Sequence, residues 1–390
     1  MATVVRGLTW DHPRAWQGLL AVTDAFNKSR PDIELRWERH SLRGFEAAPI
    51  EQIAQQFDLV TFDHPFVGDA VQAGCLLDLS EFSSQLDLAA LASDSAGASH
   101  HTYAYENGQW ALAVDAACQT AVARPDLLAA AKAAPPESLE DAVRFGERHG
   151  LGLALAVPHA FMNYLTICSL LGADISGSGD RLIDPDVAPA ALELHRRLAA
   201  CTPRAALSWS SIGLLQAMAT TDEVAWSPMV FCFNTYARPD RSAGLRKLEF
   251  LDVPGLRGAR GGPVIGGAGL AISAFCKNAD AAVTALGYLL SGSVQIEIAR
   301  AGGQPGRASA WLDESADAAN GSFFTGCWNS LSKASIRPRY PGYIGLQEEA
   351  GKILLDDASS PGLPARAVVD RIEAAHRKAR QNGMRRDGSS

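Results

Sequence analysis

Two short segments of the chain place Asp-His-Pro directly after an apolar, strand-like run. WDHPR (10–14) follows TVVRGLT, and FDHPF (62–66) follows DLVT. Carboxylate and imidazole side chains at this spacing suit three kinds of chemistry. They can hold a transition metal, form an acid–base pair, or donate and accept hydrogen bonds along one wall of a binding cleft.

Part of each motif has a simpler explanation in helix capping. Asp11 precedes Pro13, and Asp at the N-cap with Pro in the first turn is a favoured start for a helix. Asp63 stands in the same relation to Pro65. Capping does not require histidine at the middle position, so His12 and His64 are the two residues at which ligand contact should be tested first.

The first third of the chain predicts strands and helices in alternation. Strand-like runs at 3–9, 32–39 and 58–62 alternate with helical patterns at 13–30, 49–57 and 67–74. This order is typical of a parallel, doubly wound sheet with right-handed crossovers. Ligands of such sheets bind beyond the carboxyl ends of the strands. The polar residues predicted at these ends are Trp10, Asp11, His12, Arg14, His40, Ser41, Arg43, Asp63 and His64.

Further candidates lie later in the chain. Asp115 is in a long strand over 109–123 that can cross between domains, and an expected strand at 151–157 places Phe161 and Asn163 on the other side of a cleft. Trp226 lies on another expected strand. Aromatic residues in such positions are more often core residues than ligand platforms, although a sugar would need one or two of them. Gly267, in a glycine-rich stretch, and Gln304 complete the set.

Length, net charge and missing motifs argue against several classes of protein. A length of 390 residues predicts two domains or one large α/β unit, and a net charge of -8 argues against nucleic acid as a partner. The chain has no P-loop, no G-x-G-x-x-G after the first strand, no H-E-x-x-H and no G-x-S-x-G, so we expect no cofactor and no metal. It also has no run of eighteen apolar residues, so no membrane insertion is expected.

Cysteine usage and the N-terminus bear on the compartment. The seven cysteines form no C-x-x-C pair, and most lie in apolar runs, which is typical of buried free thiols. Strand-like sequence begins by Val4 without a basic and apolar leader before it. We therefore expect the protein as encoded to be cytoplasmic, or periplasmic or extracellular if a leader has been removed.

Four phrases in order resemble the family 1 extracellular solute-binding proteins, the maltose-binding-like receptors of ABC importers. They are VVRGLTWDHP with IELRWER, then FDLVTFDHPFVGDAVQAGCLLDLSEF, then YENGQWALAVDAACQTAVARPDLL, then GGQPGRASAWLD. The resemblance covers nearly the whole chain. It implies an α/β, periplasmic-binding-protein-like fold of two lobes, each a mostly parallel sheet flanked by helices, with a ligand cleft between the lobes. The implied bounds are 1–112 with 262–310, 113–261 with 311–380, and a flexible tail at 381–390.

The resemblance also implies a function. The protein would capture a small polar ligand, a sugar or an organic anion, between hinged lobes as the monomeric substrate-binding component of an ABC transporter, with the permease as its partner. An alternative remains open at this stage. On the same scaffold a cytoplasmic enzyme could use His12 or His64 as a general base, supported by Asp11 or Asp63, in a closed cleft.

Overall fold

The computed structural model describes residues 2–40, 50–238 and 244–387. The chain divides into two compact units, one formed by Met1–Ala117 and Gly266–Thr325 and the other by Cys118–Ile265 and Gly326–Ser390. Three elements run from one unit into the other: β6 (Leu112–Ala123), β9 (Ile265–Ile272) and α16 (Phe323–Ser332). The third crossing falls at 325. The lobe bounds implied by the resemblance stay a prediction.

The first unit is built on a mixed sheet in the order β2-β1-β3-β9. β1 (Thr3–Trp10) pairs in parallel with β2 (Ile33–His40) and with β3 (Leu59–Phe62), as the alternating pattern predicts. β9 pairs antiparallel with β3, with Phe62 opposite Gly269. The sheet of this unit is therefore mixed: β2, β1 and β3 are parallel, and β9 pairs antiparallel with β3.

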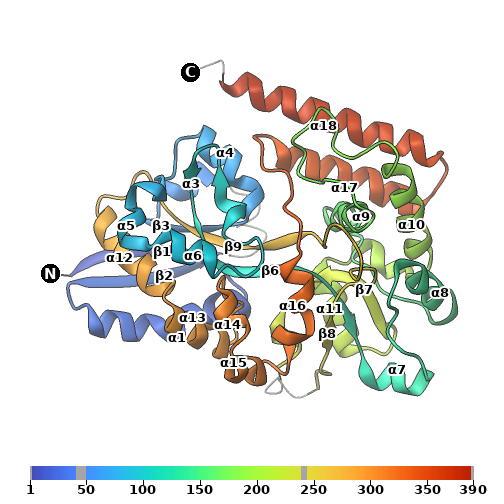
Figure 1. Ribbon diagram of the computed structural model, residues 1–390, viewed down its shortest axis with the longest axis horizontal. Helices are drawn as coiled ribbons and strands as arrows, with labels where there is room; N and C mark the ends of the chain where they lie inside the picture. The colour runs from blue at the N-terminus through green and yellow to red at the C-terminus, as the bar shows by residue number, and fades with distance from the viewer. Residues whose placement is uncertain (1, 41–49, 239–243, 388–390) are drawn as a thin grey trace. The chain divides into compact units, whose positions relative to one another are not determined.

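Helices cover both faces of this sheet. On one face Val5 and Leu59 pack with α1 (Pro13–Ser29), α12 (Ala279–Leu289) and α13 (Gly292–Arg300). On the other face Leu8 and Val60 pack with α3 (Ile50–Ala54) and α4 (Val67–Gln72). Successive strand residues point to opposite faces, so apolar runs without polar alternation are required here. Figure 1 shows α1 on one side of the strands and α3 and α4 on the other.

The remaining elements of the first unit are short. A hairpin joins β4 (Ala104–Tyr105) to β5 (Gly108–Gln109), with Tyr105 opposite Gly108. Its two turn residues, 106 and 107, come one position before the Asn107-Gly108 pair, a dipeptide that favours such turns. The others are η2 (Leu79–Phe82), α5 (Ser83–Leu86), α6 (Leu88–Ser93), η3 (His101–Tyr103), α14 (Ala308–Trp311) and α15 (Glu314–Ala319).

The strands described in the second unit pair antiparallel. β6 pairs with β7 (Trp226–Phe231) and with β8 (Glu249–Leu251). The expectation of a mostly parallel sheet in each lobe is therefore wrong for this unit. The strand expected at 151–157 is also wrong. Leu151 and Gly152 donate to the carbonyls of Cys201 and Trp226, which belong to different segments, so no regular ladder forms.

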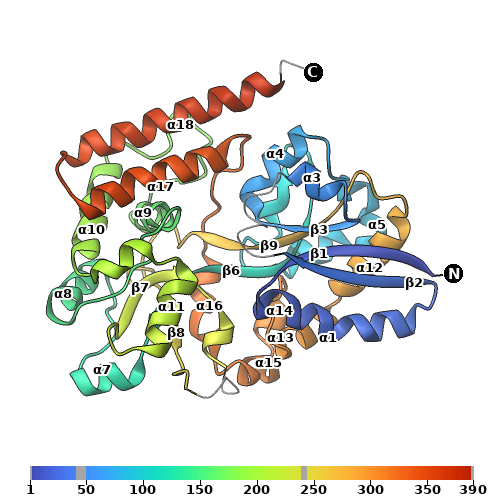
Figure 2. The same ribbon diagram turned by 180° about the vertical axis from the view of Figure 1, so that it is seen from behind.

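Helices make up most of the second unit. α9 (His159–Leu170), α10 (Ala188–Ala200), α17 (Tyr343–Ser359) and α18 (Ala365–Asp387) pack against one another, as Figure 2 also shows. The others are α7 (Pro125–Ala131), α8 (Leu139–His149), η4 (Arg204–Ser208), α11 (Ser211–Thr220) and η5 (Asn234–Tyr236). Among the described residues no single helix is long and apolar enough to span a membrane, and α12 with α13 pass that test only as a pair bent by 64°.

The C-terminal segment is more ordered than the sequence predicts. α18 continues to Asp387 through most of the stretch expected to be a flexible tail. Packing explains this extension. A Cβ added to Gly383 would lie 2.2 Å from the carbonyl oxygen of Pro341, so the helix and the segment before α17 approach closely at this point.

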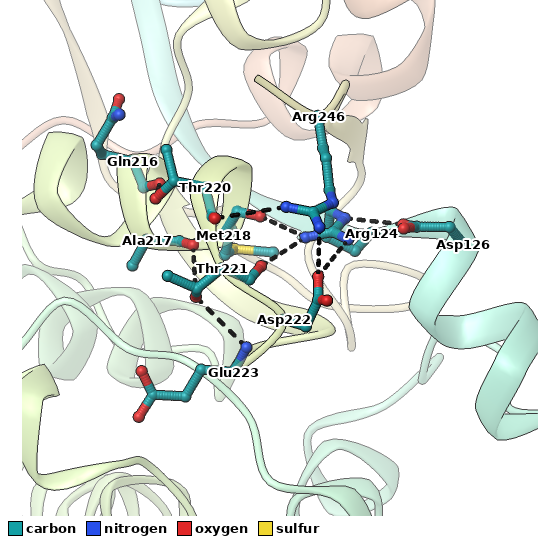
Figure 3. A network of polar contacts seen from close by, with 10 residues as sticks. All are labelled: Arg124, Asp126, Gln216, Ala217, Met218, Thr220, Thr221, Asp222, Glu223 and Arg246. Atoms are coloured by element: carbon teal, nitrogen blue, oxygen red, sulfur yellow. Dashed lines mark hydrogen bonds and ion pairs between the residues drawn. The ribbon is translucent and has the colours of Figure 1, made fainter. Parts of the chain in front are cut away.

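A buried arginine joins two elements of the second unit. The Arg124 guanidinium, which is 0% exposed, bonds both carboxylate oxygens of Asp126 at 2.8 and 2.7 Å and one of Asp222 at 2.9 Å. It also donates to the carbonyl oxygens of Met218 and Thr221, both at 2.7 Å. Arg246 lies 3.3 Å from the same Asp222 carboxylate (Figure 3). Arg124 thus ties the start of α7 to the carbonyl end of α11, where the helix dipole favours a cation.

Candidate functional site

The candidate site lies at one edge of the sheet in the first unit. β1, β2 and β3 are parallel, so their carboxyl ends at Trp10, His40 and Phe62 lie along the same edge. β9 is antiparallel and begins there. WDHPR and FDHPF are therefore neighbouring strand-end segments of one sheet, which is where ligands of α/β sheets bind.

A buried ion pair lies beneath this edge. Arg14, in the first turn of α1, donates from Nε to Oδ2 of Asp115 at 2.8 Å, and its Nη2 contacts the other carboxylate oxygen. The two side chains are 5% and 6% exposed and come from positions 101 apart in the chain. The planar guanidinium matches the carboxylate in a two-pronged geometry, and each charge compensates the other away from water.

Four of the predicted residues line a narrow cavity around this pair. Trp10, Arg14, Asp115 and Gln304 all face it, together with the hydroxyl-bearing Thr9 and Thr61. Two hydrogen bonds hold Gln304 to Ala116, the residue after Asp115. The Gln304 carbonyl oxygen accepts from the Ala116 N–H at 2.7 Å, and the Gln304 side-chain amide donates to the Ala116 carbonyl oxygen at 3.0 Å. Side chains spread over 295 positions of sequence thus meet in one place.

Gly267 has a structural role at this edge, in contrast to the predicted ligand contact. Its φ of +104° lies in the region that favours glycine, and an added Cβ would lie 2.3 Å from the carbonyl oxygen of Asp115. The position requires glycine because two backbone segments approach each other here. Gly267 has no side chain that could contact a ligand.

His12, and not Asp11, is the N-cap of α1. Its backbone is extended, and its Nδ1 accepts a hydrogen bond from the Arg14 N–H at 3.2 Å. Because Pro13 is the first helical residue, the capping position falls one residue later than the sequence suggests. Burial, with the nearby Arg14 charge, lowers the pKa of His12 to about 4, against the opposing effect of Asp11. The imidazole is therefore neutral at pH 7, and its Nδ1 can accept the hydrogen bond from the Arg14 N–H.

The second motif is arranged differently. Asp63 precedes the short 3-10 helix η1 (His64–Phe66) without a side-chain capping bond. His64 is 0% exposed, its Nδ1 lies 3.1 Å from the Asp63 carboxylate, and its ring meets the edge of Tyr103. The structure thus places His64 in the core, and the ligand contact expected for it stays a prediction. Asp63, which is 35% exposed, stays at the edge.

Sequence reasoning missed an exposed cluster beside Asp11. The Arg39 guanidinium lies over the Trp16 ring, 4.7 Å from its centroid, and 3.4 Å from the Asp11 carboxylate. Position 39 is the last but one residue of β2, so strand-end reasoning could have included it. Trp16 has no comparable signal, because one tryptophan in a helix is usually a core residue. The predicted Ser41 and Arg43 lie outside the described residues.

The candidates in the second unit are core residues. Phe161, Asn163 and Trp226 are each 0% exposed. Asn163 bonds the carbonyl oxygen of Ala154 and the amide of Gln119, both at 2.8 Å. Trp226 packs edge-on to Phe145. Phe161 and Asn163 lie on α9, which is buried from 160 to 170, and Trp226 lies on β7. The ligand contacts expected for these three residues stay predictions.

One charged group of the second unit was not singled out from the sequence. Arg337 is 3% exposed, bonds the carbonyl oxygen of Ile265 at 3.3 Å and the amide oxygen of Gln347 at 3.0 Å, and lies 5.8 Å from the centroid of the half-buried Phe231 ring. Burial and this charge lower the pKa of His159 to about 4. No spacing pattern marks the segment 335–343, so the sequence offered no signal for it.

The geometry bears on metal and acid–base chemistry. Within residues 2–40, 50–238 and 244–387, no three His, Cys, Asp or Glu side chains lie close enough together to hold a metal ion. A general base is most effective when its pKa is near the working pH, and the pKa of His12 is about 4. At neutral pH this imidazole is a weak base, and its Nδ1 is occupied by the Arg14 N–H. Hydrogen bonding to a polar ligand is what this edge can do best.

Comparison with known proteins identifies the family. A family model described as bacterial extracellular solute-binding protein matches residues 21–321. The chain belongs to this family. No curated protein sequence matches this solute-binding protein. The solved structures similar to it include maltose-bound MalE3 of T. maritima, with 16% identity, 97% of this chain and 100% of that one covered, and a TM-score of 0.80.

Two further structures are similar to this solute-binding protein. The GacH receptor of Streptomyces glaucescens, solved unliganded and with acarbose, is 19% identical over 98% of this chain and 99% of its own, with a TM-score of 0.77. An ABC transporter solute-binding protein of Agrobacterium radiobacter in complex with ribitol is 18% identical over 96% and 98%, with a TM-score of 0.73. The predicted two-lobe, periplasmic-binding-protein-like fold is confirmed.

Proposed function

We propose that this protein binds a small, uncharged, polyhydroxylated solute, a sugar or polyol, and presents it unchanged to an ABC permease. One observation supports this proposal above all. Paired charges and aromatic rings lie together at the edge of the first unit, and the chain belongs to a solute-binding family. Hydroxyl groups donate to carboxylates and accept from guanidinium groups, and sugar rings stack on aromatic faces. The structural neighbours with maltose, acarbose or ribitol in their names support this ligand class.

The charges at the edge favour a neutral ligand over an organic anion. Arg14 and Asp115 compensate each other, and Arg39 is paired with Asp11. Asp63 adds a further partly exposed carboxylate. An incoming anion would meet this carboxylate and would have to compete with Asp11 and Asp115 for the two guanidinium groups.

We assign different roles to the residues of the edge. Asp11 and Asp63, at 56% and 35% side-chain exposure, accept hydrogen bonds from ligand hydroxyls. Trp16 and Trp10 supply aromatic surface, and Arg14 with Asp115 forms the polar floor. Ligand binding would shift the population towards the conformation that binds the ligand best, and a permease would recognise that form.

We further infer that the protein works outside the cytoplasm as a monomer. The family is described as extracellular, and this supports a periplasmic or extracellular location over the cytoplasmic one expected from the first residues of the chain. An ABC permease would then be its macromolecular partner.

A thermal-shift screen tests the proposal. The panel is maltose, acarbose, ribitol and tagatose, with citrate and gluconate as organic anions, and each mixture is analysed afterwards by mass spectrometry. We expect at least one neutral compound to raise the melting temperature, because a ligand that binds only the folded state stabilises it. That compound should be recovered unchanged.

Matched variants locate the binding site. Asp11→Asn and Asp63→Asn should reduce the ligand-induced shift, whereas Asp24→Asn, on an exposed position of the same helix α1, should not. A shift caused only by the organic anions would refute the ligand class. Conversion of a panel compound that is lost in His12→Ala would instead favour the enzyme alternative.

A further inference from the structure

The seven cysteines fall into two groups by what their thiols contact. Four lie beside groups other than thiols: Cys75 donates to the carbonyl oxygen of Ala70, Cys201 to that of Arg197, Cys168 bonds Tyr164, and Cys276 bonds Asp58. The other three, Cys118, Cys232 and Cys327, are each 0% exposed and lie together in the second unit. A core can pack without a cluster of three thiols.

Strand pairing brings the first two of these residues together. Gln119 lies opposite Phe231 in the antiparallel pair of β6 and β7, so Cys118 and Cys232 are the next opposed residues. The Cys232 N–H donates to the Cys118 carbonyl oxygen at 3.1 Å. Opposed side chains point to the same face of a sheet. Their Cβ atoms stay about 4.5–5.5 Å apart, which is wider than the roughly 3.5–4.5 Å of a disulfide.

The third thiol comes from a different element. Cys327 lies in α16, the last element to enter the second unit, and its thiol is hydrogen-bonded to that of Cys232, with Cys118 next to it. A Cβ added to Gly326 would lie 2.3 Å from the carbonyl oxygen of Phe250, so α16 is packed closely onto β8, the other partner of β6. Because Cys327 is on a helix, the distance from its Cβ to that of Cys232 is not set by the cross-strand spacing.

We propose that Cys232 and Cys327 form a disulfide when the protein folds in an oxidising compartment. The bond ties α16, just after it enters the second unit, to the residue that follows β7. Cys118 stays a thiol, because the strand ladder holds its Cβ too far from that of Cys232. The proposal concerns the extracytoplasmic location inferred above and does not depend on which ligand is bound.

The chemistry is thiol–disulfide exchange. One thiolate attacks a small-molecule or protein disulfide and releases one thiol; the second thiolate then displaces the other half of the oxidant from the mixed disulfide. Two cysteine thiols are oxidised, the oxidant is reduced to two thiols, and the two protons released are taken up by its leaving thiolates. Burial raises the pKa of the Cys327 thiol, so the folded protein reacts poorly and the bond forms before the core closes.

Refolding of the full chain tests this proposal. The reduced, unfolded protein is refolded in a buffer of reduced and oxidised glutathione, free thiols are alkylated, and the linked peptides are mapped by mass spectrometry. We expect a chain two hydrogens lighter before alkylation, with Cys232 joined to Cys327 and the other cysteines alkylated. The oxidised form should have a higher melting temperature than the reduced form.

Variants separate this pair from its neighbours. Cys232→Ser and Cys327→Ser should each abolish the linkage and the difference in melting temperature, whereas Cys118→Ser and Cys276→Ser should keep both. Alkylation of both Cys232 and Cys327 after refolding would overturn the proposal, and so would a linkage that contains Cys118. Ligand binding by the fully reduced protein is measured in parallel, so that failure of the disulfide and failure of the proposed function are distinguished.

Discussion

Removing either partner of the Arg14–Asp115 pair should destabilise the protein strongly, whereas removing both should not. Both side chains are about nineteen-twentieths buried. A single substitution therefore leaves a buried charge without compensation, which costs about 3–5 kcal/mol. The walls of the cavity include Leu19, Val114 and Ile298. An apolar pair in place of the two charges would therefore meet a largely apolar surface.

The test is a double-mutant cycle with Arg14→Met, Asp115→Leu and the combined variant. Urea unfolding measures each free energy from the midpoint, provided that the slope is unchanged. We expect a loss of about 3–5 kcal/mol for each single variant, and a double variant that is as stable as the wild type or more stable by up to about 1–4 kcal/mol. Asp24→Asn, on the exposed side of α1, serves as a control with a change below about 0.5 kcal/mol. If the two losses simply add to roughly 6–10 kcal/mol, the residues act independently and the reasoning is wrong.

Three further predictions concern single residues. His12→Ala should lower the free energy of unfolding by about 0.5–2 kcal/mol through loss of the N-cap. His12→Asn should lower it much less, because asparagine can also cap a helix. Equal losses of free energy in urea unfolding would argue against capping. Burial lowers the pKa of His195 from 6.5 to about 4, so the unfolded chain binds the extra proton between these values. The free energy of unfolding therefore has its full value with respect to His195 above pH 6.5 and falls by up to about 3 kcal/mol as the pH is lowered towards 4. His195→Gln should flatten the curve of unfolding free energy against pH in this range. Arg124→Met removes the donor that two carbonyls and two carboxylates share (Figure 3). It should therefore lower the melting temperature more than Arg246→Met, because the Arg246 guanidinium is 42% exposed. The reverse order in a thermal melt would contradict a stabilising role for the Arg124 hydrogen bonds.

The sequence predicted the edge of the first unit well for a physical reason. Parallel strands joined by helices place their carboxyl ends together, so WDHPR and FDHPF could be assigned to one edge from their order alone. The detail of one residue was not predictable in the same way. The N-cap fell on His12 because the first helical residue was Pro13, and only the observed backbone conformation distinguishes that position from Asp11.

The sequence did not predict which residues far apart in the chain contact each other. Arg14 could be named from strand-end reasoning and Asp115 from the long crossing strand, but nothing in the sequence joins two residues 101 positions apart. In the second unit the apolar run at 151–157 had the composition of a strand, yet its backbone partners belong to different segments. Phe161 and Asn163 were then placed relative to a strand that does not form, and they lie in the core.

Calorimetric titration of the protein with the neutral sugars and polyols tests the central claim most directly. The account predicts that one of them binds reversibly with one molecule per chain and is recovered unchanged. It also predicts that Asp63→Asn weakens this binding by about tenfold, the equivalent of one charged hydrogen bond, while Asp24→Asn leaves it unaltered. Conversion of the compound, or binding that Asp11→Asn and Asp63→Asn both leave unchanged, would contradict the account.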